Sequence, residues 1–398
     1  MSLPYRIAET SSIRNFMKEL SFPLYFSKPA QQHIEEFIVA SSQTGYRGKV
    51  VDMVDLGYSL CHRTTYGKFL SQGNWNQDYI WRAIRKRAHK RIQQQGNKSG
   101  KPVFAIYDDT ISEKVKPSSK AMRPIEETAF HYSHLEHKQV WGHQMLTALL
   151  SCNGEVLPYF LERYTRGEES KIDKVCRIID VLPPATGEAY GLCDSWFTCR
   201  QVIDAHWKKG YHLIGGLKTN RIIYPQGIGI QIKDFEAYIE KSDVHLVTVN
   251  NSSYWVYRYD GALNGIDEAT VILCWPEDGF KESRCLRAFL CTNTELDTNT
   301  ILEYYSQRWP IEVFFRQTKG NFGLNKYQVR SSLAIDRLLA LITLAYLYCV
   351  CGTGCYQALH YGLQRLRMSS RRSLIHFVYS AAQQLVPLEN ILVQLNLA

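Results

Sequence analysis

The stretch YYSQRWPIEVFFRQTK, from Tyr304 to Lys319, sets one acidic residue among several cations. Glu312 follows Arg308 by four residues, and Arg316 and Lys319 come four and seven residues after it. On a helix, residues at these spacings lie on one face. A face that served solubility alone would mix both signs of charge. The pattern therefore predicts a helix face that holds an anionic partner beside a single carboxylate.

Pro310 interrupts this stretch two residues before Glu312. Inside a continuous helix, proline removes a hydrogen bond and distorts the backbone. Proline is also common at the first position of a helix. The sequence leaves two alternatives, either one kinked helix or a new helix that begins at Pro310. In the second case, Tyr305 and Arg308 would point differently from Glu312 and Lys319.

Two further carboxylates stand at the ends of apolar runs. Asp108 directly follows VFAIY, and Asp194 directly follows AYGLC. Both runs are typical of buried strands, and α/β proteins build their sites at the C-terminal ends of strands. We therefore expect these two acids to converge, with Glu312 brought to the same place by its helix. An aspartate after a strand is also typical of a turn or a helix cap, and Asp109 is the alternative to Asp108.

Three converging carboxylates are hard oxygen ligands, which suit divalent cations. Two such ions can act on the attacking and leaving oxygens of a phosphodiester. The cations Arg308, Arg316 and Lys319 would then meet the phosphates of a nucleic acid. The alternative for Glu312 taken alone is an ordinary row of salt bridges on a helix surface.

A second basic stretch runs from Arg82 to Lys101 and holds eight Lys or Arg residues and no acid. Its apolar spacing predicts a helix, and its charge suits a polyanion such as nucleic acid. We therefore expect Arg85, Arg87 and Lys90 to contact DNA. The alternative is a helix face that is only solvated.

The rest of the chain predicts an α/β domain between helical regions. After residue 100 the order is strand, hairpin, helix, strand, helix, strand, with the hairpin turn at Asn153-Gly154. Alternating polarity between Gly, Asn and Asp residues then indicates a β-rich insertion at about 220–292. We expect a helical DNA-binding region at 1–100, a catalytic domain at 101–335 and a helical region at 336–398.

Composition agrees with an intracellular, folded protein. The 398 residues are enough for two or three domains, and 47 Lys and Arg against 38 Asp and Glu give a net charge of +9. Eleven irregularly spaced cysteines argue against a disulfide framework. The longest apolar run, LLALITLAYLYCVCG, is short for a membrane span and predicts a core helix. We expect a cytoplasmic protein, with no membrane partner.

These features together resemble DDE transposases of bacterial insertion sequences. In one large group of that family, the last acid lies in the motif Y-(2)-R-(3)-E-(6)-K, and Tyr305, Arg308, Glu312 and Lys319 match every spacing. The family's first acid closes the first strand and is often followed by threonine two positions on, as in YDDT here. Its second acid closes the fourth strand, as in GLCDSWF. The 118 residues from Asp194 to Glu312 leave room for the β insertion of this group.

The resemblance covers roughly residues 100–335 and implies both a fold and a chemistry. The fold would be α/β, with an RNase H-like catalytic core that contains the β-rich insertion. Asp108, Asp194 and Glu312 would be the catalytic acids and would hold two Mg²⁺ or Mn²⁺ ions. Tyr305, Arg308 and Lys319 would position the phosphates of the DNA end.

The implied function is cut-and-paste DNA transposition, in which the element's ends are cut and a freed 3′-hydroxyl attacks target DNA. The N-terminal helices would recognise the terminal inverted repeats, a homodimer would hold both ends in the synaptic complex, and the protein would act at the nucleoid. Two alternatives remain. One is a metal-dependent nuclease of the same fold without strand transfer, and the other is a domesticated DNA-binding protein. The presence of all three acids favours an active enzyme.

Overall fold

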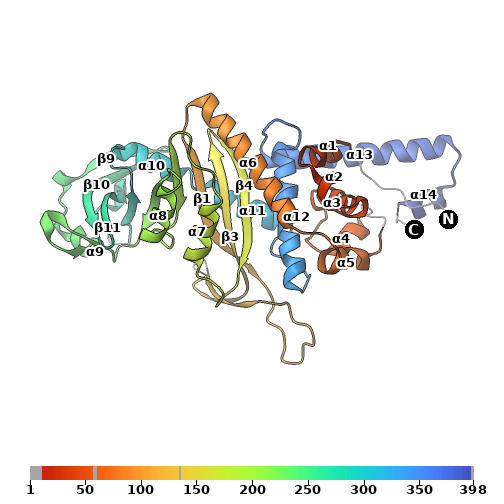
Figure 1. The fold of residues 1–398 in the computed structure, drawn as a ribbon, viewed down its shortest axis with the longest axis horizontal. Helices are drawn as coiled ribbons and strands as arrows, with labels where there is room; N and C mark the ends of the chain where they lie inside the picture. Colours follow the sequence, from red (N-terminus) through yellow and green to blue (C-terminus); the bar gives the residue numbers. More distant parts are fainter. Residues whose placement is uncertain (1–10, 57–60, 134–135, 283, 396–398) are drawn as a thin grey trace.

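The apolar run before Asp108 forms the first part of an inner strand of a large mixed sheet, seen in a computed structural model (Figure 1). The structure describes the chain except residues 1–10, 57–60, 134–135, 283 and 396–398. Twelve strands of the described part join in this one sheet. Their bounds are β1 (Val103–Glu113), β2 (Ala129–Ser133), β3 (Lys138–Cys152), β4 (Glu155–Tyr164), β5 (Ala189–Cys193), β6 (His212–Leu217), β7 (Ile222–Ile223), β8 (Ile230–Gln231), β9 (His245–Val249), β10 (Ser252–Leu263), β11 (Ile266–Pro276) and β12 (Arg287–Cys291).

The first half of the sheet has the predicted order of elements. β1 pairs in parallel with β5, and β5 with β6, while β3 pairs antiparallel with both β1 and β4. All five residues of β5 are buried, as expected for a parallel strand covered on both faces. The turn between β3 and β4 has positive φ at Asn153 and Gly154, which suits the predicted hairpin. An additional short strand, β2, pairs antiparallel with the first residues of β3, Lys138–Gly142.

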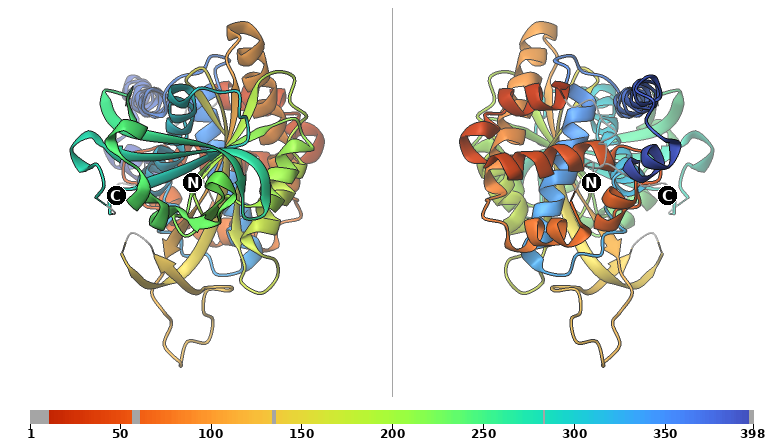
Figure 2. Two further views of the ribbon diagram at one scale, coloured as in Figure 1. Left: turned by 90° about the vertical axis from the view of Figure 1, so that its left-hand side faces the viewer. Right: turned by 90° about the vertical axis from the view of Figure 1, so that its right-hand side faces the viewer.

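The β-rich region continues the same sheet. β12 pairs antiparallel with β6, and β11, β10 and β9 follow in order on its far side. Figure 2 views the molecule from its β-rich end and from its helical end. In both views, the segment between β1 and β2 extends away from the body.

The helices gather at both ends of the chain and between the core strands. In chain order they are α1 (Ser11–Glu19), α2 (Phe22–Tyr25), α3 (Lys28–Ser41), α4 (Val50–Asp55), α5 (Arg63–Gln72), α6 (Asp78–Ser99), α7 (Lys171–Asp180), α8 (Arg200–Trp207), α9 (Ile232–Phe235), α10 (Thr298–Ser306), α11 (Pro310–Asn321), α12 (Ser332–Cys351), α13 (Leu359–Gln383) and α14 (Leu388–Gln394). Short 3₁₀ turns lie at Pro225–Gly227, Glu236–Tyr238, Lys241–Asp243 and Glu277–Gly279.

α12 joins the N-terminal helices to the sheet. It packs against α3, α5, α6 and β4 and lies between the sheet and the N-terminal helices (Figure 1). By length and composition it is the one described helix that could cross a membrane, but 89% of its apolar window is buried inside the protein. The structure thus agrees with its prediction as a core helix.

No disulfide bond joins the described elements of this core. All eleven cysteines are free thiols. Cys349 and Cys351 are buried on α12, whereas Cys355 is exposed. Cys355 escapes burial because α12 ends at Cys351, so that Cys355 falls in the turn that follows.

Candidate active site

Asp108 lies within β1 and not at its end, which corrects the expectation from the sequence. The strand continues to Glu113 because β3 pairs with it antiparallel along its whole length. The parallel partner β5 stops earlier, since its pairing with β1 ends at Ile106 and Leu192. Asp108 therefore lies just beyond the C-terminal end of β5, on the side of β1 that β5 no longer covers.

Asp194 directly follows β5, as predicted. Its Oδ1 accepts a hydrogen bond of 3.0 Å from the backbone N–H of Trp196, which turns the chain away from the strand. Burial raises the pKa of Asp194, although this backbone hydrogen bond acts in the opposite direction. The carboxylate is therefore held close to Asp108 at the same end of the two parallel strands, and its charge contributes to the raised pKa of Asp108.

Glu312 lies in the first turn of α11, and the chain breaks between α10 and α11. α10 ends at Ser306, and Pro310 occupies the first turn of α11. The second alternative for this stretch is thus correct, and the single continuous helix face of the first alternative is wrong. Proline begins α11 because its missing N–H would have had no helical partner at that position.

Arg308 lies in this break and joins two of the three acids. Its Nη1 lies 2.5 Å from Asp108 Oδ2, and its Nη2 lies 3.2 Å from Glu312 Oε1. Burial raises the pKa of Asp108 to about 7, against the lowering effect of Arg308 and with a further rise from Asp194. Residues from positions 108, 194 and 312 of the chain therefore form one electrostatic cluster.

Asp109 points to a different partner. Its Oδ2 accepts a hydrogen bond of 2.7 Å from Lys171 Nζ, at the start of α7. Successive residues of a strand face opposite sides of the sheet, so that Asp108 meets Arg308 while Asp109 meets Lys171. The charge of Asp109 still raises the pKa of Asp194. Sequence reasoning missed Lys171, because nothing local links it to a residue 62 positions earlier.

The other residues of the motif have separate surroundings. Lys319 Nζ donates a hydrogen bond of 2.6 Å to Thr110 Oγ1, which ties the end of α11 to β1. Tyr305 packs on Phe289 with ring centroids 4.5 Å apart, and burial raises its pKa to about 12. Arg316 is exposed on α11.

The basic stretch in α6 is largely part of the helix packing. Its apolar residues Ile80, Ile84, Ala88 and Ile92 are buried, and the helix packs against β4, β3 and α12. Two of its cations pair with carboxylates. Arg87 lies 3.1 Å from Glu19, and Arg91 donates two hydrogen bonds of 2.7 and 2.6 Å to Glu155.

The three other cations in the middle of α6 differ in exposure. Lys86 and Lys90 are exposed, and Arg85 is half-buried. The structure thus leaves Lys90 open to a partner on the surface. Arg87 pairs with Glu19, so a DNA phosphate would have to compete with this carboxylate for the Arg87 guanidinium.

Among the described residues, no three His, Cys, Asp or Glu side chains stand in position to hold one metal ion. The Arg308 guanidinium donates hydrogen bonds to Asp108 Oδ2 and Glu312 Oε1. The donor set nevertheless suits a hard divalent cation in its chemistry, because carboxylate oxygens are the ligands that such ions prefer and burial raises the pKa of Asp108 and Asp194. A cation in this cluster would lower both pKa values.

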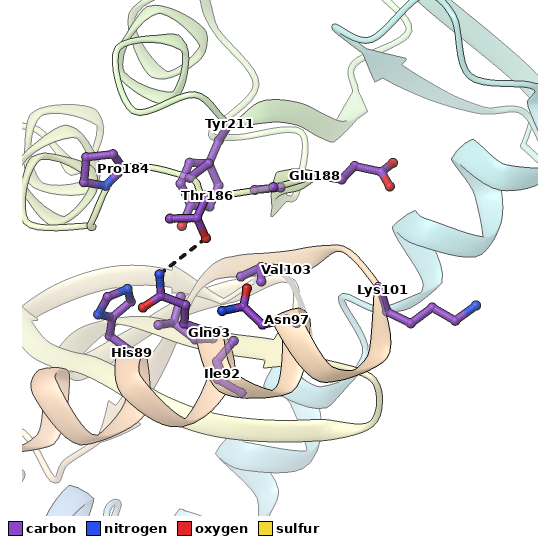
Figure 3. A pocket seen from close by; sticks show the side chains of 16 residues that line it. His89, Ile92, Gln93, Asn97, Lys101, Val103, Pro184, Thr186, Glu188 and Tyr211 are labelled. Carbon is purple, nitrogen blue, oxygen red and sulfur yellow. Dashed lines mark hydrogen bonds between the residues drawn. The ribbon is translucent and has the colours of Figure 1, made fainter.

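A separate small pocket lies at the opposite ends of the strands (Figure 3). It is lined by Val103 and Ala189, the first residues of β1 and β5. His89 and Gln93 of α6 border it, and Gln93 Nε2 donates a hydrogen bond of 3.4 Å to Thr186 (Figure 3). The five residues of β5 span about 16 Å, so this pocket is remote from the acids.

Comparison with known proteins gives the family. Residues 99–348 match the model of the transposase DDE domain, which covers more than half of the chain. None of the curated proteins matches. Among solved structures, the chain is similar to piggyBac transposase in a synaptic complex with hairpin DNA, with 12% identity, 93% of this chain and 82% of that chain covered, and a TM-score of 0.49. DDE transposases generally use divalent metal ions. By its DDE domain and its mixed α/β fold, the chain belongs to the DDE transposase family and is a DNA transposase.

Proposed function

We propose that the chain cuts DNA at the ends of its own element and joins the freed ends to target DNA, with Asp108, Asp194 and Glu312 as the catalytic acids. One observation carries the proposal: residues from β1, the end of β5 and α11 meet in one cluster, with Arg308 hydrogen-bonded to Asp108 and Glu312. Structural ion pairs also join acids to arginine, but the C-terminal ends of parallel strands are where α/β sheets place their ligands, which favours a site here.

The three acids would hold two Mg²⁺ or Mn²⁺ ions. When bound, these ions supply Lewis-acid activation of the attacking and leaving oxygens of the phosphodiester. The carboxylates orient the ions and keep them next to the scissile bond. The raised pKa of Asp108 is consistent with a residue whose charged form needs a nearby cation.

The basic residues would hold the DNA. Arg308 presents a planar guanidinium that can grip a phosphate with two hydrogen bonds. Lys319 on α11 and Tyr305 on α10 would add further contacts to the DNA end. Arg316 is open to solvent and would add charge to the path of the duplex. On α6, Arg85, Arg87 and Lys90 would contribute phosphate contacts remote from the cut.

The chain would work as a homodimer, because one element has two ends and each end needs an active site. It would act at the nucleoid, where its DNA lies. The four residues at motif spacing support assignment to the insertion-sequence group with Y-(2)-R-(3)-E-(6)-K. The N-terminal helices α1–α6 would recognise the terminal inverted repeats.

The test is a reaction of the purified full chain with a duplex copied from the DNA that borders its gene, together with a supercoiled target plasmid. We expect cuts at the element ends and joined products in Mg²⁺ or Mn²⁺, and neither in EDTA. Cuts without joined products would favour the nuclease alternative. Binding without cuts would favour a domesticated DNA-binding protein. Size-exclusion chromatography with light scattering, with and without the duplex, tests the dimer.

A further inference from the structure

The irregular segment between β1 and β2 carries cations that meet no acid. Residues 114–125 hold four basic side chains and no Asp or Glu. Lys116, Lys120 and Arg123 are exposed, and no carboxylate pairs with them in the described part of the chain. Figure 2 shows this segment reaching away from the body of the molecule. We call residues 115–124 the basic arm.

The basic arm has no core of its own. Val115 is 93% exposed and Met122 is 96% exposed. Pro117 and Pro124 each fix a backbone angle of the arm, and such fixed positions reduce the conformational entropy that a segment loses when it binds a partner. The arm therefore presents its side chains to solvent on a partly stiffened backbone.

The base of the basic arm is fixed by the segment that follows α11. Lys114 Nζ donates a hydrogen bond of 2.9 Å to the backbone carbonyl of Asn325. At the other end of the arm, the guanidinium of Arg330 donates to the backbone carbonyl of Arg123 at 2.5 Å. The backbone N–H of Glu126 in turn donates to the carbonyl of Arg330 at 2.9 Å. Because both ends are anchored, the arm keeps a defined place relative to β1.

An open hollow of about 420 Å³ lies between the basic arm and this anchoring segment. Arg123 from the arm and Arg330 from the anchoring segment line it, together with Trp141 of β3. The described residues that line the hollow include no Asp or Glu. Its basic walls therefore have no acid beside them that would neutralise their charge.

The basic arm is remote from the acid cluster although it continues the same strand. β1 runs on from Asp108 to Glu113 before the arm begins, which separates the two by about 16 Å. A duplex advances by about 3.4 Å for each base pair. A duplex cut at Asp108 would therefore meet the arm about five base pairs or more from the scissile phosphate.

The anchoring segment also lies beside the N-terminal helices. Gly323, just after α11, approaches Gly48 in the loop between α3 and α4 so closely that a Cβ on Gly323 would lie 2.2 Å from Gly48 Cα. The anchoring segment follows this contact and leads into α12, which packs against α3 and α5. The arm and the N-terminal region therefore adjoin the same stretch of chain, which favours one duplex that contacts both.

A row of exposed cations without acids suits the phosphates of a duplex. A second copy of this chain has a net charge of +9 and offers no overall charge complementarity. We propose that the basic arm binds the backbone of the element-end duplex on the element side of the cut, about five base pairs or more from the acids. Lys116, Lys120 and Arg123 contact its phosphates.

This inference rests on the proposed function, because it takes the acids as the point of cleavage and α1–α6 as the helices that recognise the terminal repeats. It assigns a DNA contact to a segment outside the four-residue motif.

The test uses the full chain in EDTA, so that binding is measured without cleavage. One variant combines Lys116→Gln, Lys120→Gln and Arg123→Gln and removes the three charges. A second combines Lys116→Arg, Lys120→Arg and Arg123→Lys and keeps them. Met122→Ala is the matched control for an exposed, uncharged side chain of the same arm. Anisotropy titrations at several salt concentrations compare these proteins on the element-end duplex.

We expect the charge-removing variant to bind about tenfold or more weakly than wild type. Its slope of log K against log salt should be flatter by about 0.9 for each lost phosphate contact. The charge-keeping variant and Met122→Ala should match wild type. Thermal unfolding should be unchanged in all of them, because the substituted side chains are exposed. An unchanged affinity and slope in the charge-removing variant would overturn the proposal.

A photocrosslinking amino acid in place of Met122 locates the contact, with the element-end duplex and a supercoiled target plasmid both present. We expect cross-links on the element side of the cut, about five base pairs or more from it. Cross-links confined to flanking DNA, to the target plasmid or to a second copy of the chain, or none to the duplex, would overturn the proposal.

These readouts do not depend on catalysis. A wild-type protein that binds the end duplex but does not cut it in Mg²⁺ or Mn²⁺ would refute the proposed function, whatever the arm contacts. Normal cleavage by wild type, with a charge-removing variant that binds equally well, would refute the arm contact alone.

Discussion

The two basic stretches of this chain look alike in sequence and differ in the folded protein. In the stretch around Glu312, Arg308 lies between α10 and α11 and reaches Asp108, 200 residues away in the chain. In α6, Arg91 reaches Glu155 at the start of β4, Arg87 reaches Glu19, and the helix packs on β4 and β3 of the sheet. A row of cations therefore does not by itself identify a binding surface. The acid that each cation meets, and what else surrounds that acid, distinguishes a site from a structural ion pair.

The largest expected effect concerns the acids. Asp108→Asn, Asp194→Asn and Glu312→Gln should each reduce cleavage by about 10³-fold or more, the scale of losing a principal electrostatic group. Binding of the end duplex should persist, because the phosphate contacts remain. Gel-based cleavage and fluorescence anisotropy measure the two quantities.

Asp109→Asn is the neighbouring control, since Asp109 pairs with Lys171. Normal cleavage by Asp108→Asn together with none by Asp109→Asn would reverse the choice between these neighbours. Full activity of any one of the three variants would remove that residue from the site.

Arg308→Gln should reduce cleavage about 100-fold, the loss expected when a substrate is misplaced by about 1 Å. Arg308→Lys should not restore full activity, because an ammonium lacks the planar fork. Without DNA, Arg308→Gln should bind Mn²⁺ about fivefold more tightly, since removing a cation beside the acids is worth about 1 kcal/mol. Calorimetry at about pH 8.5, where carboxylates are ionised, measures this affinity.

Arg316→Gln removes the same charge from an exposed position on α11 and should leave the Mn²⁺ affinity near wild type. Equal Mn²⁺ affinities in wild type and Arg308→Gln would mean that Arg308 does not compete with the metal.

Arg91→Gln should act on stability and not on DNA. It breaks two hydrogen bonds to a mostly buried carboxylate, Glu155, for an expected loss of about 2 kcal/mol in the free energy of unfolding. Chemical denaturation measures the loss, and binding titrations at several salt concentrations should show an unchanged slope. A flatter slope with unchanged stability would place Arg91 on the DNA and break the comparison.

Lys319→Ala should weaken the hold on the DNA end about tenfold, the equivalent of one charge-assisted hydrogen bond of about 1.5 kcal/mol. Arg316→Ala, on the exposed side of the same helix, should have a smaller effect. Anisotropy with the end duplex compares them. If both variants bind the end duplex as wild type does, Lys319 and Arg316 do not contact the DNA, and Arg308 is the one cation of this stretch with a possible role in binding.

The smallest effects belong to the exposed cations of α6. Lys86→Gln and Lys90→Gln should change stability by less than about 0.5 kcal/mol. If they contact duplex phosphates, each should flatten the slope of log K against log salt by about 0.9. An unchanged slope would leave α6 as a structural helix with a solvated face.

Much of the fold followed from local patterns. The runs VFAIY and AYGLC, the Asn153-Gly154 turn and the helix after it carry their own signals of burial, turn geometry and period. The extension of β1 to Glu113 did not follow, because DDTISE is polar and stays extended only through its pairing with β3. The continuation of the sheet from β6 through β12 also required long-range pairing.

The candidate site was likewise predicted only in part from the sequence. Its four motif residues and its two aspartates could be selected from the sequence, because each aspartate follows an apolar run and the motif residues have fixed spacings. Their mutual contacts could not, since Arg308 meets Asp108, and Lys319 meets Thr110, across about 200 residues of chain.

The residue order therefore specified the class of fold, the candidate acids and the family, because backbone period and short-range spacing are properties of neighbours in the chain. The packed chain decided which cations face those acids and which are neutralised elsewhere. The physical reason is that an ion pair depends on distance in space, and β3, β5 and α11 set those distances only when the sheet has formed.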